Sequence, residues 1–104
     1  MFTRNDTQLL STQYFRVLRE TENYFEIQSH NTKHCWIIMK FPLPDIKPVT
    51  IYHKHKIKTA YYHKHADAFT VEHAIKIIKG HDDYVLHPER YTYARAEKKH
   101  RLAQ

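Results

Sequence analysis

Two neighbouring stretches indicate the fold most clearly: Tyr24-Phe25-Glu26-Ile27-Gln28-Ser29, which alternates polar and apolar side chains, and His34-Cys35-Trp36-Ile37-Ile38-Met39-Lys40-Phe41, which is rich in strand-forming residues. Asn31-Thr32 between them is typical of a turn. A period of two predicts strands, so these stretches are expected to pair. Strand character resumes at Val49-Thr50-Ile51-Tyr52-His53-Lys54-His55. The intervening connection contains prolines, which neither a helix nor a central strand tolerates: Pro42, Pro44 and Pro48.

The main helix is expected near 70–80, with Thr70 as its N-cap and Gly80 where it would stop or bend. Its apolar stripe follows helical spacing through Val71, Ala74, Ile75 and Ile78. A short turn or second helical piece is expected at 81–86, before His87-Pro88. A second helix is predicted over 6–19, where an alternating strand is the competing interpretation.

These elements together predict the α+β class. The expected architecture is a three- or four-stranded antiparallel sheet packed by an N-terminal helix and by the main helix. Residues 1–88 would form a single domain, and 89–104 a basic tail that is loosely helical or disordered. The length of 104 residues is that of one domain.

Residues that occur only once exclude several function classes. The single glycine, Gly80, rules out phosphate-binding loops and dinucleotide folds, which need several glycines. The single cysteine, Cys35, permits no internal disulfide and is expected in the core. No apolar run at the N-terminus suggests secretion or membrane insertion, so we expect a soluble, cytoplasmic protein without a membrane partner.

Positive charge is concentrated in two segments. The net charge is +6, with ten histidines uncounted. Segment 48–66 has four lysines, four histidines and no acidic residue, and segment 88–104 has five basic residues against two acidic ones. Segment 1–47 is nearly balanced at +1, and segment 67–87 carries −2. Clustered basic charge is typical of proteins that bind polyanions, so the expected partner is RNA, DNA or a nucleoprotein complex.

The first basic segment contains a repeat. Tyr52-His53-Lys54-His55 recurs ten residues later as Tyr62-His63-Lys64-His65. If both copies are strands of one hairpin, the pairing register decides whether the four imidazoles share a face. No glycine or asparagine marks the turn, so the sequence leaves that register open.

Two chemical interpretations of the repeat use the same candidate residues, His53, His55, His63 and His65. The first is metal binding, because His-x-His on a strand points two potential zinc ligands the same way. The surrounding lysines count against it, and no cofactor is assigned. The second is metal-independent ribonuclease chemistry, in which one histidine accepts the 2′-hydroxyl proton and another protonates the leaving oxygen. No enzymatic activity is assigned.

Binding alone is the favoured interpretation, because it makes the fewest demands; the competing one is that the basic side chains simply face solvent. Lysines would contact phosphates and tyrosines would stack on unpaired bases. The preferred function is a small basic nucleic-acid-binding accessory protein. The expected contact residues are Tyr52, Lys54, Lys56, Lys58, Tyr61, Tyr62 and Lys64, with Arg90, Arg95, Lys98, Lys99 and Arg101 in the tail.

Two further histidines receive structural interpretations. His34 adjoins Cys35 along a strand, so the two side chains point to opposite faces and cannot pair with each other. His81-Asp82-Asp83 is expected to place charge at a helix end, with a histidine–carboxylate or metal-ligand role as the alternative. Trp36 is expected to anchor the core.

Several of these motifs together resemble small proteins carried by conjugative elements, plasmids and prophages of Gram-positive bacteria. The resemblance covers about 23–87 and depends on His34-Cys35-Trp36-Ile37-Ile38, the doubled Tyr-His-Lys-His, Ala74-Ile75-Lys76 and His81-Asp82-Asp83-Tyr84-Val85. It attaches no mechanism to any residue. It implies a mobile-element context, and with it an alternative function as an inhibitor of a nucleoprotein defence effector, such as an anti-CRISPR protein.

Overall fold

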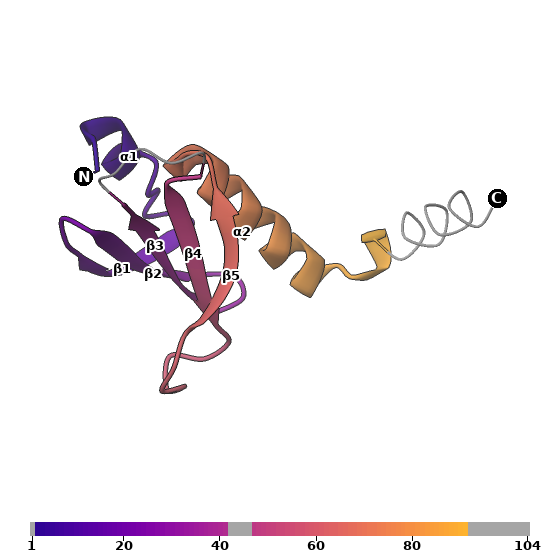
Figure 1. Ribbon diagram of the computed structural model, residues 1–104. Coiled ribbons are helices and arrows are strands. Elements are labelled where there is room, and N and C mark those ends of the chain that lie inside the picture. The colour runs from indigo at the N-terminus through magenta and orange to yellow at the C-terminus, as the bar shows by residue number, and fades with distance from the viewer. Residues whose placement is uncertain (1, 42–46, 92–104) are drawn as a thin grey trace.

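The computed structural model describes residues 2–41 and 47–91 and shows one antiparallel sheet crossed by a helix (Figure 1). The strands follow one another across the sheet in chain order. The α+β class is therefore confirmed, whereas the expected number of strands is wrong because the sheet has five. The elements are α1 (Arg4–Gln8), β1 (Phe15–Glu20), β2 (Tyr24–Ser29), β3 (Cys35–Lys40), β4 (Val49–Lys54), β5 (His63–Ala68) and α2 (Val71–Leu86).

The extra strand comes from the N-terminal region, where a helix over 6–19 was expected and is wrong. Thr3 and Asp6 form a capping box that starts α1, but this helix ends at Gln8, with Leu9 as its C-cap. From Phe15 the chain pairs with β2 instead. Phe15 is 1% exposed and packs in the core, because a strand buries its side chain against the sheet's other apolar residues.

The sheet has two different faces. One face carries the apolar core and is covered by α2, which lies against β3, β4 and β5 (Figure 1). The opposite face carries two cross-strand pairs. Tyr24 of β2 stands across from Met39 of β3, and Ile37 of β3 stands across from Tyr52 of β4. The expected pairing of the first two stretches as β2 and β3 is confirmed.

Helix α2 is longer than the apolar stripe suggested. Thr70 caps it as expected, accepting a hydrogen bond from the His73 amide. The helix then continues through Gly80 to Leu86, so the expected stop or bend at Gly80 is wrong. Gly80 is exposed, and its only disadvantage is its low helix propensity. Glycine costs about 1 kcal/mol relative to alanine in a helix, which the packing of α2 against the sheet outweighs. The helix ends at His87, before Pro88.

Some expectations concern parts of the chain outside the described residues. Two of the three prolines of the β3–β4 connection and most of the basic tail fall there. Neither described helix has the length and apolar character of a membrane span.

Candidate metal centre under helix α2

Six histidine rings, including the exposed His63, gather where the sheet meets the C-terminal half of α2. His53 lies at their centre, with its ring centroid 5.0 Å from those of His34 and His55, 5.5 Å from that of His65 and 4.8 Å from that of His81. The rings come from β4 and the residue just beyond it, β5, the residue before β3, and α2. The cluster is therefore a product of tertiary structure and not of one motif.

The pairing of β3 with β4 brings the first two histidines together. His53 stands opposite Trp36, and the two rings stack at 4.1 Å. His34 lies two residues before Trp36 and so shares its face of the sheet. The two rings share a hydrogen bond, with His34 Nδ1 2.9 Å from His53 Nε2.

A β-bulge sends His65 to the same side. Ile51 pairs with Ala66, but Tyr52 pairs with Lys64, so His65 is the extra residue. Bulges re-aim side chains in this way. The ring of His65 meets the edge of Trp36 at 5.3 Å.

The register that the sequence left open therefore brings the four repeat histidines around one centre. His63 stands opposite His53, at a ring separation of 5.4 Å, although His63 itself is exposed. His55 stacks on His34 at 4.8 Å. The alternation of histidine with lysine in the repeat thus separates the two residue types by face within β4.

Three of the imidazoles are arranged as metal ligands. One ring nitrogen from each of His34, His53 and His81 lies within 4.8 Å of the other two. Tetrahedral zinc with Zn–N bonds of 2.0–2.1 Å holds its nitrogens about 3.4 Å apart, so the side chains would have to adjust from their separations of up to 4.8 Å to bind one ion together. Nε2 of His81 is the one buried side-chain nitrogen or oxygen among the described residues that has no hydrogen-bond partner. An ion at the centre of the trio would give this nitrogen a partner.

The protein environment favours the neutral imidazole, which is the form that binds metal. Burial, reinforced by His81 and His34, lowers the pKa of His53 to about 3. Burial also lowers the pKa of His34, His65 and His81, and neighbouring imidazoles add to the effect. Asp82 opposes the shift at His34 and His81 but does not reverse it.

A buried carboxylate supports the cluster from below. Asp82 is fully buried and accepts hydrogen bonds from the hydroxyls of Tyr14 at 2.7 Å, Ser29 at 2.6 Å and Thr32 at 2.9 Å. The indole nitrogen of Trp36 donates to Ser29 Oγ at 3.2 Å. These bonds tie the last turns of α2 to β2 and to the turn before His34. The expectation that Asp82 merely adds charge at a helix end is wrong.

Two expected nucleic-acid contacts are engaged within the protein. Lys54 Nζ donates to the carbonyl oxygens of Ile57 at 3.1 Å and Thr59 at 2.9 Å, and lies 4.6 Å from the ring centre of Tyr62. The Tyr62 hydroxyl donates to Glu26 at 2.8 Å. Both side chains hold the β4–β5 loop against the sheet.

The remaining expected contacts are dispersed. Lys64 pairs with Asp67 at 3.1 Å, and Arg90 pairs with Asp83 at 3.1 Å. Tyr52 is half-buried on the sheet face away from α2. The β4–β5 loop exposes three of the expected contact residues, Lys56, Lys58 and Tyr61. Outside the described residues lie Arg95, Lys98, Lys99 and Arg101.

The sequence predicts His53 as a candidate ligand and gives His81 a metal-ligand role only as the alternative, and it does not indicate His34 as a ligand. His34 was weighed only against Cys35, which is buried and paired with Lys54 on the other face. His81 was separated from the main helix by the assumption that Gly80 ended it. Extending the stripe Ala74, Ile78 by one further turn reaches His81, and this signal would have found it.

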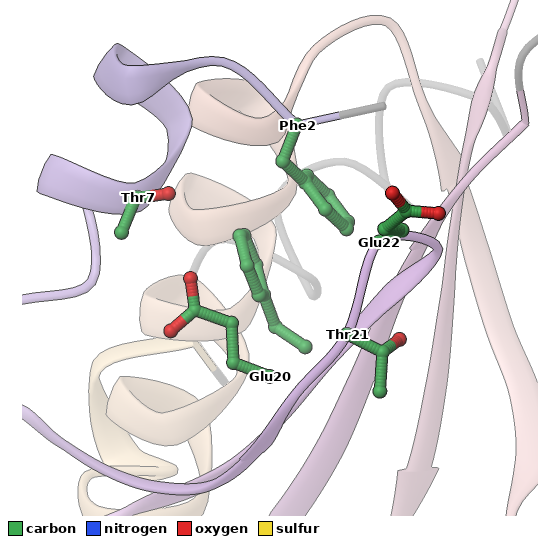
Figure 2. A pocket seen from close by; sticks show the side chains of 6 residues that line it. Phe2, Thr7, Glu20, Thr21 and Glu22 are labelled. Atoms are coloured by element: carbon green, nitrogen blue, oxygen red, sulfur yellow. The ribbon is translucent and has the colours of Figure 1, made fainter.

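A separate hollow lies beside β1 and β2, away from the histidine cluster. It measures about 390 Å³ and is formed by the N-terminal segment and the β1–β2 turn (Figure 2). Phe2 stacks on Phe25 there at 3.8 Å, and two carboxylates, Glu20 and Glu22, stand at its rim. None of its lining residues is a histidine. The hollow is thus chemically unlike the histidine cluster.

No family model matches the sequence, and neither a curated protein nor a solved structure matches it. The resemblance to mobile-element proteins stays a prediction.

Proposed function

We propose that the protein binds a divalent transition-metal ion, with zinc as the first candidate, through His34, His53 and His81. The observation that carries the proposal is the convergence of ring nitrogens from three histidines, which lie on β4, on α2 and just before β3. The His81 ring also has a buried nitrogen, Nε2, without a hydrogen-bond partner. Buried polar groups are nearly always satisfied, so the unpartnered Nε2 of His81, on a ring beside two other imidazoles, supports a missing partner.

The donor set narrows the choice of ion. Imidazole suits zinc, copper, nickel and iron, whereas calcium and magnesium prefer oxygen ligands. The only thiol, Cys35, lies on the opposite face of β3 and is unavailable. Three protein ligands leave one position of a tetrahedral ion for water or for an atom of an incoming ligand, which is typical of reactive zinc sites.

Metal-independent acid–base catalysis is the competing function of the same histidines. A general acid must carry a proton near the working pH. His53, with its pKa lowered to about 3, is neutral near pH 7, so it carries no imidazolium proton to donate and is a weak base. The central ring therefore suits a metal ligand better than a proton donor.

The test is a titration of chelator-treated protein with zinc, measured by calorimetry and by competition with a chromogenic chelator. We expect one zinc per chain. His34→Gln and His81→Gln should each weaken zinc binding at least 10-fold, because each removes one of three ligands. His73→Gln is the matched control: His73 lies on α2 with His81 but belongs to no metal group, and glutamine can still accept from the Phe69 amide.

Circular dichroism of each variant would establish that the fold is retained. The proposal is abandoned if the wild-type protein takes up no zinc, or if His34→Gln and His81→Gln bind zinc as tightly as His73→Gln does.

A further inference from the structure

An open pocket of about 560 Å³ adjoins the histidine cluster where the β2–β3 turn meets the loop after β4. Three lysines line it, Lys33, Lys56 and Lys58, together with His34 and His55. No acidic residue is among its lining residues. A concave surface with one sign of charge concentrates counter-ions of the other sign, so the pocket suits an anion.

The three lysines are available to a ligand. All are exposed, and none takes part in the ion pairs found among the described residues. This distinguishes them from Lys54 and Lys64, which have partners inside the protein. Because they are unpaired, binding an anion would cost them no existing ion pair.

Lys33 also carries a backbone signal. Its φ is 66°, in the left-handed region that favours glycine or asparagine. The Lys33 amide donates to the Ser29 carbonyl, and the Lys33 carbonyl accepts from the Gln28 side chain. A lysine therefore stands in this tight turn where glycine would fit the backbone better, and backbone strain of this kind is often found at functional sites.

An exposed aromatic ring stands on the other side of His55. Tyr61 is 84% exposed and lines a smaller hollow of about 250 Å³ together with His55 and His63. Exposed aromatic rings beside basic grooves are stacking platforms for unpaired bases, and such stacking does not depend on base identity. His55 thus separates an anion pocket from an aromatic platform.

We propose that this surface binds single-stranded nucleic acid, with backbone phosphates in the pocket of Lys33, Lys56 and Lys58 and a base against Tyr61. The inference rests on the proposed metal function, because His34 belongs both to the pocket wall and to the ligand trio. A phosphate in the pocket would lie next to the ion, whose charge would add to that of the lysines.

The test is fluorescence anisotropy with labelled single-stranded RNA and DNA 12-mers of one sequence, on zinc-loaded and chelator-treated protein. We expect binding at low salt that weakens steeply as salt increases, and tighter binding with zinc. The RNA and DNA arms show which sugar the surface accepts, and binding of either supports the inference. Lys56→Ala/Lys58→Ala should weaken binding at least 10-fold and reduce the salt dependence.

Two further variants separate a binding defect from a folding defect. Lys33→Gly removes a charge while relieving the backbone, so it should weaken binding several-fold with thermal stability equal to or above wild type. Tyr61→Ala should weaken binding without changing the salt dependence. The matched control is Lys76→Ala/Lys79→Ala on α2, which removes the same charge elsewhere and should change affinity less than twofold.

Absence of oligonucleotide binding at low salt overturns the inference, as does an equal loss in the α2 lysine control. Equal affinity with zinc and with chelator overturns the placement of the phosphate beside the metal. Zinc titration of each lysine variant keeps the two proposals distinct. If wild-type protein binds zinc but no oligonucleotide, this inference fails and the metal site stands. If it binds no zinc, the metal site fails, and with it the placement of the phosphate beside the ion.

Discussion

The two halves of the interface between α2 and the sheet are built from different chemistry. The N-terminal half packs Val71, Ala74 and Ile78 against apolar strand residues such as Ile38 and Ile51. The C-terminal half replaces this packing with a cluster of imidazoles above a buried carboxylate. The same helix and the same sheet thus enclose a dry core at one end and a polar site at the other.

The contrast separates apolar packing, which stabilises the protein, from buried polar groups that need partners. Apolar burial is favourable without further partners, at about 25 cal/mol per Å². Imidazoles under a helix lose hydration, and the orphaned Nε2 of His81 shows that the loss is not fully repaid by hydrogen bonds. Natural proteins accept such local costs mainly at functional sites.

The largest expected effect is in the apolar half. Ile38 is fully buried, so Ile38→Ala should lower the free energy of unfolding by about 2–5 kcal/mol through lost burial and a cavity. Urea unfolding measures this. Zinc affinity should stay within twofold of wild type, and a large fall in affinity would show that the two halves are not separable.

Acid should weaken the histidine half of the metal-free protein. Folding lowers the pKa of His53 from 6.5 to about 3, so below pH 6.5 the unfolded chain binds a proton at this residue that the folded protein does not bind. His53 therefore leaves the free energy of unfolding unchanged above pH 6.5 and lowers it as the pH falls toward 3. The titratable groups whose rings surround it are the other imidazoles, His34, His55, His63, His65 and His81. At pH 4 the loss from His53 alone is about 3 kcal/mol. Urea unfolding in chelator from pH 7 to 4 measures it, and a flat profile would contradict it.

Zinc should stabilise the protein through the histidine half alone. At free zinc 100 times the Kd, the free energy of unfolding should rise by about 2.7 kcal/mol. His34→Gln should lose this increment at the same zinc concentration, whereas Ile38→Ala should keep it on a lower baseline. Chemical unfolding with zinc or chelator measures both, and an increment that survives in His34→Gln would place the metal elsewhere.

The smallest expected effect lies at the boundary of the two halves. An added Cβ at Gly80 would meet nothing within 4 Å. Gly80→Ala should therefore raise the free energy of unfolding by about 0.5–1 kcal/mol through helix propensity. Zinc affinity should be unchanged. Destabilisation would mean that α2 depends on the glycine.

The elements with strong local patterns could be predicted. The alternation in β2, the run of strand-forming residues in β3, the stripe of α2 and its Thr70 cap all appear in the structure as expected. The N-terminal region could not, because its apolar residues fit both periods and only pairing with β2 makes Phe15 a strand residue. Gly80 misled in the opposite direction: tertiary packing on both sides of it outweighs a cost of about 1 kcal/mol.

The candidate site divides in the same way. The repeat drew attention to His53, but its partners His34 and His81 stand 19 and 28 positions away from it in the printed sequence. Bringing them together requires the β3–β4 register and an uninterrupted α2. His65 joins them only because of a bulge in β5, which no local sequence signal marked.

The sequence by itself determined the α+β class, the strand character of most of the sheet and the presence of a histidine-rich basic segment, because these depend on composition and short-range periodicity. Tertiary structure decided which histidines meet, which lysines are free and which are engaged. Register, bulges and helix length act over distances that a local pattern does not encode, and a shift of one residue in the strand register would move an imidazole to the other face of the sheet.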